Sequence, residues 1–90
     1  MFRLWGKIFH ENHLIKDTVI CNDDTNLNRT KKIFQGLDSI CYEFDLQTPI
    51  WLDTNKKDFM QHSKTRFYSD SFIESIDFDF LEIQVIEEDY

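Results

Sequence analysis

The sequence predicts an α+β fold in the order ββα(α)β, with a three-stranded, mainly antiparallel sheet and one long amphipathic helix across one face. Three observations support this prediction. Apolar residues alternate with a period of two near the N-terminus and again near the C-terminus, which is typical of strands. Between these segments, an apolar stripe repeats with helical period over residues 27–44. Packing such a helix on a sheet is the simplest arrangement that buries the stripe.

The first two strands are expected in FRLWGKIF and LIKDTVIC, which are separated by the four polar residues HENH. Two strands joined by so short a loop form a β-hairpin. Alternation along the first strand places on one face Phe2, Leu4, Gly6 and Ile8. The opposite face receives Arg3, Trp5, Lys7 and Phe9. The second face is therefore not simply a solvated face, because two of its four side chains are large aromatics.

The long helix is expected over residues 26–44. A cap for its first free N–H groups can come from Asp23, Asp24 or Thr25. The apolar stripe consists of Leu27, Phe34, Leu37, Cys41 and Phe44, with Ile33 and Ile40 alongside. Gly36 lies inside this helix, where glycine costs about 1 kcal/mol relative to alanine. A close approach of the helix to the sheet would explain a glycine at this position.

A second, short helix is expected across NKKDFMQHS, with Phe59 and Met60 buried. Its cap can come from Asp53 or Thr54. Pro49 separates the two helices, because proline lacks an N–H group and biases the preceding residue toward extended geometry. The segment KTRFYSD is interpreted as a connection that leads into a turn through SFIES.

The last strand is expected in residues 76–88, IDFDFLEIQVIEE, where the alternation changes phase. Apolar residues occupy the even positions up to Phe80 and the odd positions from Leu81 onward. A slip of one residue sends the apolar set to the opposite face of a strand. Either a β-bulge near residues 80–81 re-aims the strand, or the strand is covered on both faces. Both explanations predict a central strand, or one covered by a partner, rather than a free edge.

Length and charge limit the function classes. Ninety residues predict a single domain over residues 1–90. The formal net charge is −7, and residues 67–90 carry eight acids without any Lys or Arg. Nucleic acid is therefore not an expected partner, because phosphate binding needs clustered positive charge. Since the sequence has two cysteines, no signal-peptide pattern and no long apolar run, we expect a cytoplasmic protein without membrane contact.

Residues 61–67, QHSKTRF, gather positive charge and hydroxyl groups in an otherwise acidic chain. A small anionic or phosphate-bearing ligand could be bound there by His62, Ser63, Lys64, Thr65 and Arg66. The alternative is a solvated connection after a helix C-terminus, where His and Lys complement the helix dipole. Because no glycine-rich phosphate loop is present, the solvated connection is the simpler interpretation.

No catalytic or metal-binding set stands out in the sequence. His10 and His13 flank a carboxylate on the hairpin loop, but no third strong ligand is near in sequence. Cys41 lies on the helix stripe, where a buried cysteine acts as a small hydrophobic residue. The alternating acids in residues 74–79 are interpreted as a solvated face rather than as an acid–base pair. We therefore expect no catalytic residue, no metal and no cofactor, and an enzyme is less expected than a binding protein.

Aromatic residues beyond the needs of one helix and one sheet face indicate an interaction surface. After the long helix has covered one face, the uncovered set contains Trp5, Phe9, Trp51, Phe67 and Tyr68. Either residues 50–76 of the same chain cover these side chains, or another chain does. In the second case, the expected contacts of a homodimer or of a protein partner are Trp5, Phe9, Trp51 and Tyr68.

The strings RLWGKI, KDTVI, EFDL followed by TPIWL, HSKTRF and IDFDFLEIQVIEE extend over most of the chain. Together they resemble a group of short, uncharacterised proteins of anaerobic Gram-positive bacteria. The resemblance implies a stand-alone bacterial domain, and it implies no activity and no functional residue. We therefore expect a non-catalytic module for self-association or protein interaction, with anion binding through residues 62–66 as the alternative.

Overall fold

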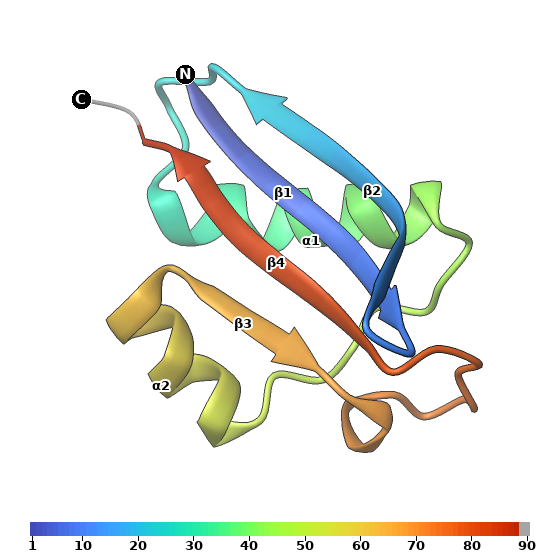
Figure 1. Cartoon of the computed structure of the whole chain (residues 1–90). Coiled ribbons are helices and arrows are strands. Elements are labelled where there is room, and N and C mark those ends of the chain that lie inside the picture. Colours follow the sequence, from blue (N-terminus) through green and yellow to red (C-terminus); the bar gives the residue numbers. More distant parts are fainter. Residues whose placement is uncertain (89–90) are drawn as a thin grey trace.

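The computed structural model describes residues 1–88. Residues 2–22, in which apolar and polar side chains alternate, form the predicted β-hairpin (Figure 1). The described elements, in chain order, are β1 (Phe2–His10), β2 (His13–Asn22), α1 (Arg29–Glu43), α2 (Asp53–His62), β3 (Lys64–Phe67), the 3₁₀ turn η1 (Ser69–Ser71) and β4 (Phe80–Glu87). Helix α1 lies behind the sheet in Figure 1, and α2 runs alongside β3. The predicted α+β class and antiparallel sheet are confirmed.

The sheet has four strands in the order β2-β1-β4-β3, so the prediction of three strands is wrong. The missed strand is β3, which pairs antiparallel with β4. Its four residues, KTRF, contain a single apolar side chain, and a strand this short leaves no periodic pattern. The segment becomes a strand because β4 offers it an edge with which to pair. Thr65 and Phe67 are buried, whereas Lys64 and Arg66 point to the other face.

The phase change in the last segment marks the start of β4 rather than a bulge within it. Residues 76–79 precede the strand, and the regular alternation begins at Phe80. Irregularities in the β1 ladders lie elsewhere, at Ile8/Phe9 against β2 and at Arg3/Leu4 against β4. The expectation of a central strand is confirmed, because β4 pairs with β1 on one side and with β3 on the other.

Helix α1 approaches the sheet closely through two glycines. A Cβ atom on Gly36 would lie 2.8 Å from Leu4 Cδ2, and one on Gly6 would lie 2.6 Å from Ile40 Cγ2. Both distances are far inside ordinary carbon contacts, so the predicted reason for Gly36 is confirmed. The helix begins later than predicted, because Asn28 is its cap, with Oδ1 accepting a hydrogen bond from the Lys31 N–H at 2.9 Å.

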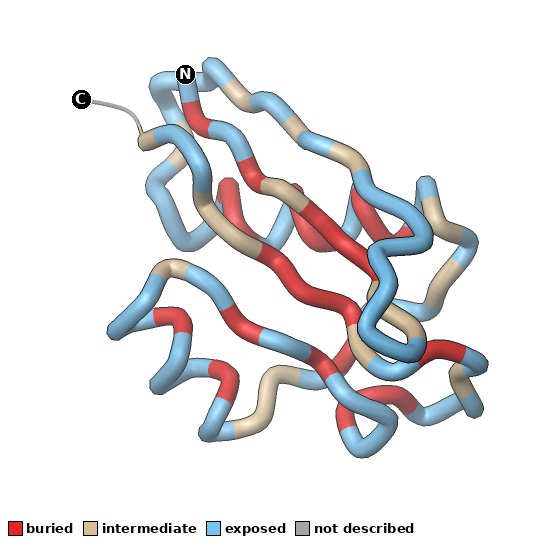
Figure 2. Tube along the Cα trace, viewed as in Figure 1, coloured by how far each residue is buried: buried red, intermediate tan, exposed pale blue. Residues whose placement is uncertain are grey.

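The second helix forms as predicted, with differences at its start and on its surface. Leu52 precedes α2, and its N–H donates to Asn55 Oδ1 at 3.0 Å, so neither Asp53 nor Thr54 is the cap. Phe59 is buried, whereas Met60 is 87% exposed, contrary to the prediction. Helix α1 covers the face of the sheet that is turned away from the viewer in Figure 1, and Phe59 of α2 joins the same core. The buried residues of the sheet gather in β1, β4 and β3 (Figure 2).

Candidate interaction surface

One face of the sheet carries no helix within residues 1–88, and we call it the open face. Since Leu4, Gly6 and Ile8 point toward α1, the alternate positions of the strands point the opposite way. Strand register assigns to the open face Arg3, Trp5, Lys7, Phe9, Leu14, Asp17, Val19, Cys21, Lys64, Arg66, Phe80, Glu82, Gln84 and Glu87. Figure 1 looks directly onto this face.

The centre of the open face is an ion cluster of Lys7, Glu82 and Arg66. Lys7 Nζ lies 2.6 Å from Glu82 Oε2, and Arg66 Nε donates to Glu82 Oε1 at 3.0 Å. Lys7 Nζ also donates to Gln84 Oε1 at 3.0 Å. The Lys7 and Glu82 side chains are only 8% and 6% exposed, although no helix covers them. A charge this well shielded needs a close partner, and the cluster provides one for each of its two buried ions.

The cluster changes the protonation behaviour of its members. Burial raises the pKa of Glu82, but hydrogen bonds from Lys7 and Arg66 outweigh burial, and the pKa lies below its usual value. The hydrogen bond to Glu82 also raises the pKa of Arg66. Glu82 is therefore a structural carboxylate that stays ionised at neutral pH. A general acid requires a raised pKa, whereas the pKa of Glu82 is lowered.

Aromatic rings form the walls that keep water from these charges. Lys7 Nζ lies 3.8 Å from the centroid of the Trp5 ring, and the Arg66 guanidinium lies 4.5 Å from that of Phe80. Phe80 in turn stacks on Phe9, with the ring centroids 5.1 Å apart. Trp5 and Phe9 are half-buried, and each is in contact with a side chain of its own face, Lys7 for Trp5 and Phe80 for Phe9.

The apolar surface continues from the centre of the open face to β2. Trp5 Nε1 donates to Asp17 Oδ2 at 3.0 Å, which ties the indole to that strand. Leu14 and Val19 of the same face are exposed. Ile15 is exposed too, but it lies at the register shift and lines a hollow on the helix side with Ile8 and Phe44. A run of exposed aliphatic side chains on one strand is unusual for a strand that faces only water.

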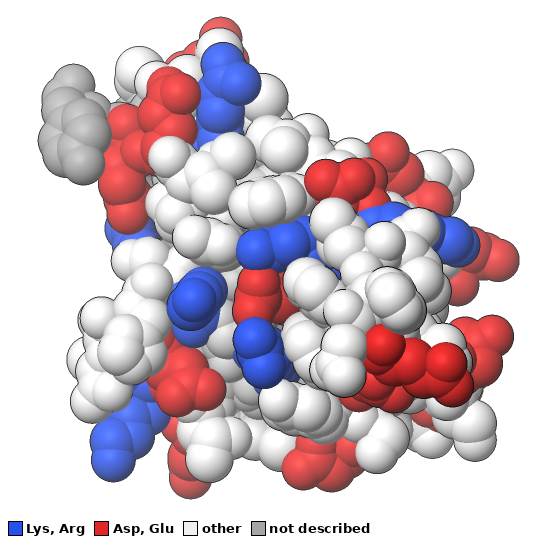
Figure 3. Space-filling view, viewed as in Figure 1, with Lys and Arg blue, Asp and Glu red and all other residues white. Residues whose placement is uncertain are grey.

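The open face is almost neutral although the chain as a whole is acidic. Register places four basic residues on it, Arg3, Lys7, Lys64 and Arg66, against three acids, Asp17, Glu82 and Glu87. Basic and acidic side chains lie next to one another in the middle of this view (Figure 3). Because the formal net charge of the chain is −7 and basic residues outnumber acids on this face, all of the excess negative charge lies outside it.

The four predicted interface residues separate into two groups. Trp5 and Phe9 lie on the open face, and Tyr68 joins them because its ring packs on Phe80 at a centroid distance of 5.4 Å. Trp51 lies on the opposite side of the sheet. Its ring makes edge contacts with Phe34, Phe59 and Phe67 at 5.1–5.7 Å.

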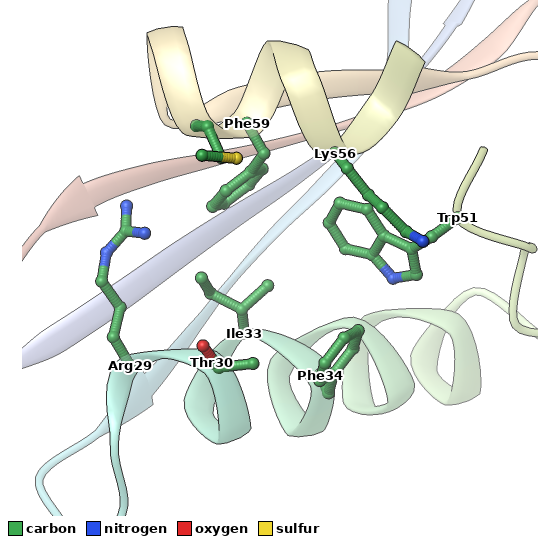
Figure 4. Close-up of a pocket in the computed structure, with 8 residues that line it drawn as sticks. Arg29, Thr30, Ile33, Phe34, Trp51, Lys56 and Phe59 are labelled. Carbon is green, nitrogen blue, oxygen red and sulfur yellow. The ribbon is translucent and has the colours of Figure 1, made fainter. Parts of the chain in front are cut away.

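Trp51 lines a groove between α1 and α2 that has a volume of about 250 Å³ (Figure 4). Ile33 and Phe34 of α1 form one wall, and Phe59 and Lys56 of α2 form the other. Trp51 Nε1 is buried without a hydrogen-bond partner. The groove is smaller than the roughly 300–1,000 Å³ typical of small-molecule sites.

Four of the five predicted anion-binding residues, His62, Lys64, Thr65 and Arg66, line one shallow hollow, and Ser63 is not among its lining residues. Thr65 faces the core side, where its Oγ1 accepts a hydrogen bond from Asn55 Nδ2 at 2.9 Å. Ser63 Oγ accepts one from Arg29 Nη2 at 3.1 Å. Arg66 is held by Glu82. His62 and Lys64 remain exposed, and the shallow hollow beside them also contains two acids, Asp58 and Glu82. The surroundings therefore give an anion little net attraction.

The other candidate chemistry groups are structural in their surroundings. Burial raises the pKa of the Cys41 thiol to about 12, with a smaller contribution from Asp38, so this thiol is protonated at neutral pH. Within residues 1–88, no group of three or more His, Cys, Asp and Glu side chains is arranged to hold a metal ion. Among the same residues, no helix has the length and apolar character needed to cross a membrane.

Comparison of the chain with protein-family models, with curated proteins and with solved structures gave no significant match. The resemblance to short bacterial proteins stays an expectation from the sequence strings alone. Any functional conclusion therefore depends on the geometry described above.

Proposed function

We propose that this protein is a small, non-catalytic module that associates with a second copy of itself. The observation that supports the proposal most strongly is the combination of half-buried aromatics on the open face with exposed aliphatic side chains on the adjoining β2. Contiguous apolar surface of this kind is characteristic of interaction sites rather than of faces that remain in water.

Charge also favours a second copy as the partner. Two chains of net charge −7 repel each other on average, and the open face has almost no net charge. Association through this face or its β2 border therefore keeps most of the negative charge of both chains away from the contact. We further propose a cytoplasmic location, an expectation with which the two free thiols of Cys21 and Cys41 are compatible.

The proposal is tested by molar mass in solution over a concentration series, measured by light scattering or by sedimentation equilibrium. We expect the mass to rise from that of one chain, 10.9 kDa, toward twice that value as concentration increases. Val19→Ser should shift this transition to higher concentration because it removes exposed apolar contact area on β2. Ile73→Ser is the matched control, since Ile73 is 78% exposed and lies outside both the open face and β2. A mass of one chain at every concentration would contradict the proposal.

A further inference from the structure

The two edges of the sheet differ in how they are protected against pairing. Edge strand β3 has only four residues, and its outward side chains are the charged Lys64 and Arg66. Its backbone is also capped from outside, because Asn55 Nδ2 of α2 donates to the Arg66 carbonyl at 2.8 Å. Short length, charge and a covering side chain are the devices by which proteins prevent an edge strand from pairing with another chain.

The β2 edge is neither short nor covered in the part of the chain that the structure describes. It is ten residues long, and no described element lies along its outer side (Figure 1). Lys16 and Asp17 are its only Lys, Arg, Asp or Glu residues, and they cancel in charge. Its exposed aliphatic residues are Leu14, Ile15 and Val19. A long, nearly neutral and apolar edge is the kind that adds another strand.

The helix layer ends in apolar surface at the same edge. Ile20 of β2 and Tyr42 of α1 line one hollow there, together with Asp38, Ser39 and Glu43. The Tyr42 side chain is 88% exposed. A neighbour that approached this edge would therefore meet both the sheet and the end of α1, which gives more contact area than backbone pairing alone.

We propose that β2 pairs antiparallel with β2 of a second copy, so that the two sheets form one continuous eight-stranded sheet. This inference rests on the proposed self-association and specifies its geometry. The pairing is isologous, with a twofold axis perpendicular to the sheet, because only that axis makes the two strands antiparallel and keeps both helices on one face.

Charge complementarity supports a second copy as the occupant. Lys16 points to the helix side, since it pairs in register with Ile8, and it has no ion-pair partner among residues 1–88. On the same side, Thr18 Oγ1 donates to Glu43 Oε2 at 2.8 Å. A twofold axis near residues 17–18 brings Lys16 opposite Thr18 or Ile20 of the partner subunit. Either position is next to Glu43 of the partner subunit, so the dimer gains two symmetric ion pairs.

A charge-reversal experiment tests this contact between chains rather than within one. In Lys16→Glu, two acids face each other at both symmetric contacts, and in Glu43→Lys, two lysines do. We expect each variant alone to dimerise at least about tenfold more weakly than the parent protein, because attraction is replaced by repulsion at two places. In an equimolar mixture of the two variants, every contact in the mixed dimer is attractive again. The dissociation constant of the mixed dimer should then lie within about threefold of that of the parent dimer.

The outcomes separate this inference from the function on which it rests. If both variants dimerise as strongly as the parent protein, the edge pairing is overturned while self-association stands. If each variant is weakened and mixing restores nothing, the edge pairing is overturned too, since a contact between chains requires rescue. If the parent protein itself stays at the mass of one chain, both proposals fail. Circular dichroism of each variant confirms that the fold is retained.

Discussion

The two faces of the sheet bury their side chains by different means, although the same strands build both. On the covered face, α1 lies against Leu4, Gly6 and Ile8, and the contacts are almost entirely apolar. On the open face, Lys7 and Glu82 are nearly as well shielded, but the shielding comes from aromatic rings of neighbouring strands. The comparison teaches that a single layer of long side chains can exclude water from an ion pair. Its apolar rim, however, stays exposed and available to a partner.

The largest loss of stability is expected from a substitution on the covered face. Leu4→Ala removes a fully buried side chain against which Gly36 packs, and α1 cannot move closer to fill the cavity. We expect the free energy of unfolding to fall by about 3–5 kcal/mol, measured by chemical denaturation. A loss below about 1 kcal/mol would show that the covered face is not the rigid core described here.

A somewhat smaller loss is expected on the open face from Glu82→Gln. This change leaves Lys7 buried without a carboxylate while the size of the side chain is retained. The free energy of unfolding should fall by about 2–4 kcal/mol, since breaking one side of a buried ion pair strands its partner. As a control, Glu87→Gln alters a half-exposed carboxylate on the same face and should cost less than about 1 kcal/mol. Equal losses in the two variants would contradict the burial of the cluster.

The pH dependence of stability distinguishes the cluster from ordinary surface charge. Because the pKa of Glu82 is lower in the folded protein than its ordinary value of 4.5, the folded state binds this proton less readily than the unfolded state does. The stabilisation is therefore fully present above that value and is lost as pH falls through the lower folded pKa. The difference in unfolding free energy between the parent protein and Glu82→Gln should shrink with acidification. A difference that does not change with pH would contradict this assignment.

The smallest effect concerns the two thiols, one on each side of the sheet. Cys21 is exposed on β2, whereas Cys41 is buried under α1 with its pKa raised to about 12. Since the thiolate is the reactive form, a thiol reagent at pH 8 should modify one cysteine rapidly in the folded chain. That cysteine is the exposed Cys21, and the buried Cys41 should react only after denaturation. Rapid modification of both thiols in the native protein would show that the covered face opens easily.

Periodic elements could be predicted from the sequence, and elements defined by their neighbours could not. The hairpin follows from alternation and α1 from its apolar stripe, whereas α2 follows from Pro49 and the polar residues after it. The four-residue β3 has no such pattern, because it exists by pairing with β4. Residues 76–79 alternate as a strand does, yet β4 begins only at Phe80, one residue after the Asp79 N–H donates to the Phe9 carbonyl.

The candidate site was even less visible in the sequence than the fold. Lys7 and Glu82 are direct neighbours across the β1–β4 ladder, but this register is known only once β4 is placed beside β1. Alternation correctly puts Trp5 and Phe9 together on the second face. It gives no guidance for Trp51, which lies in an irregular connection and packs on the helix side. The one feature of the sequence that could have indicated the ion cluster was Lys7, a charged residue between two aromatics on one face of a strand.

The most direct test of the account is backbone hydrogen exchange measured at low and at high protein concentration. We expect the amides of β2, residues 13–22, to exchange more slowly as concentration rises, because the free edge of the strand becomes paired. Amides of β3, residues 64–67, should exchange at the same rate at both concentrations, since α2 already protects that edge. Exchange rates in β2 that do not depend on concentration would contradict the account.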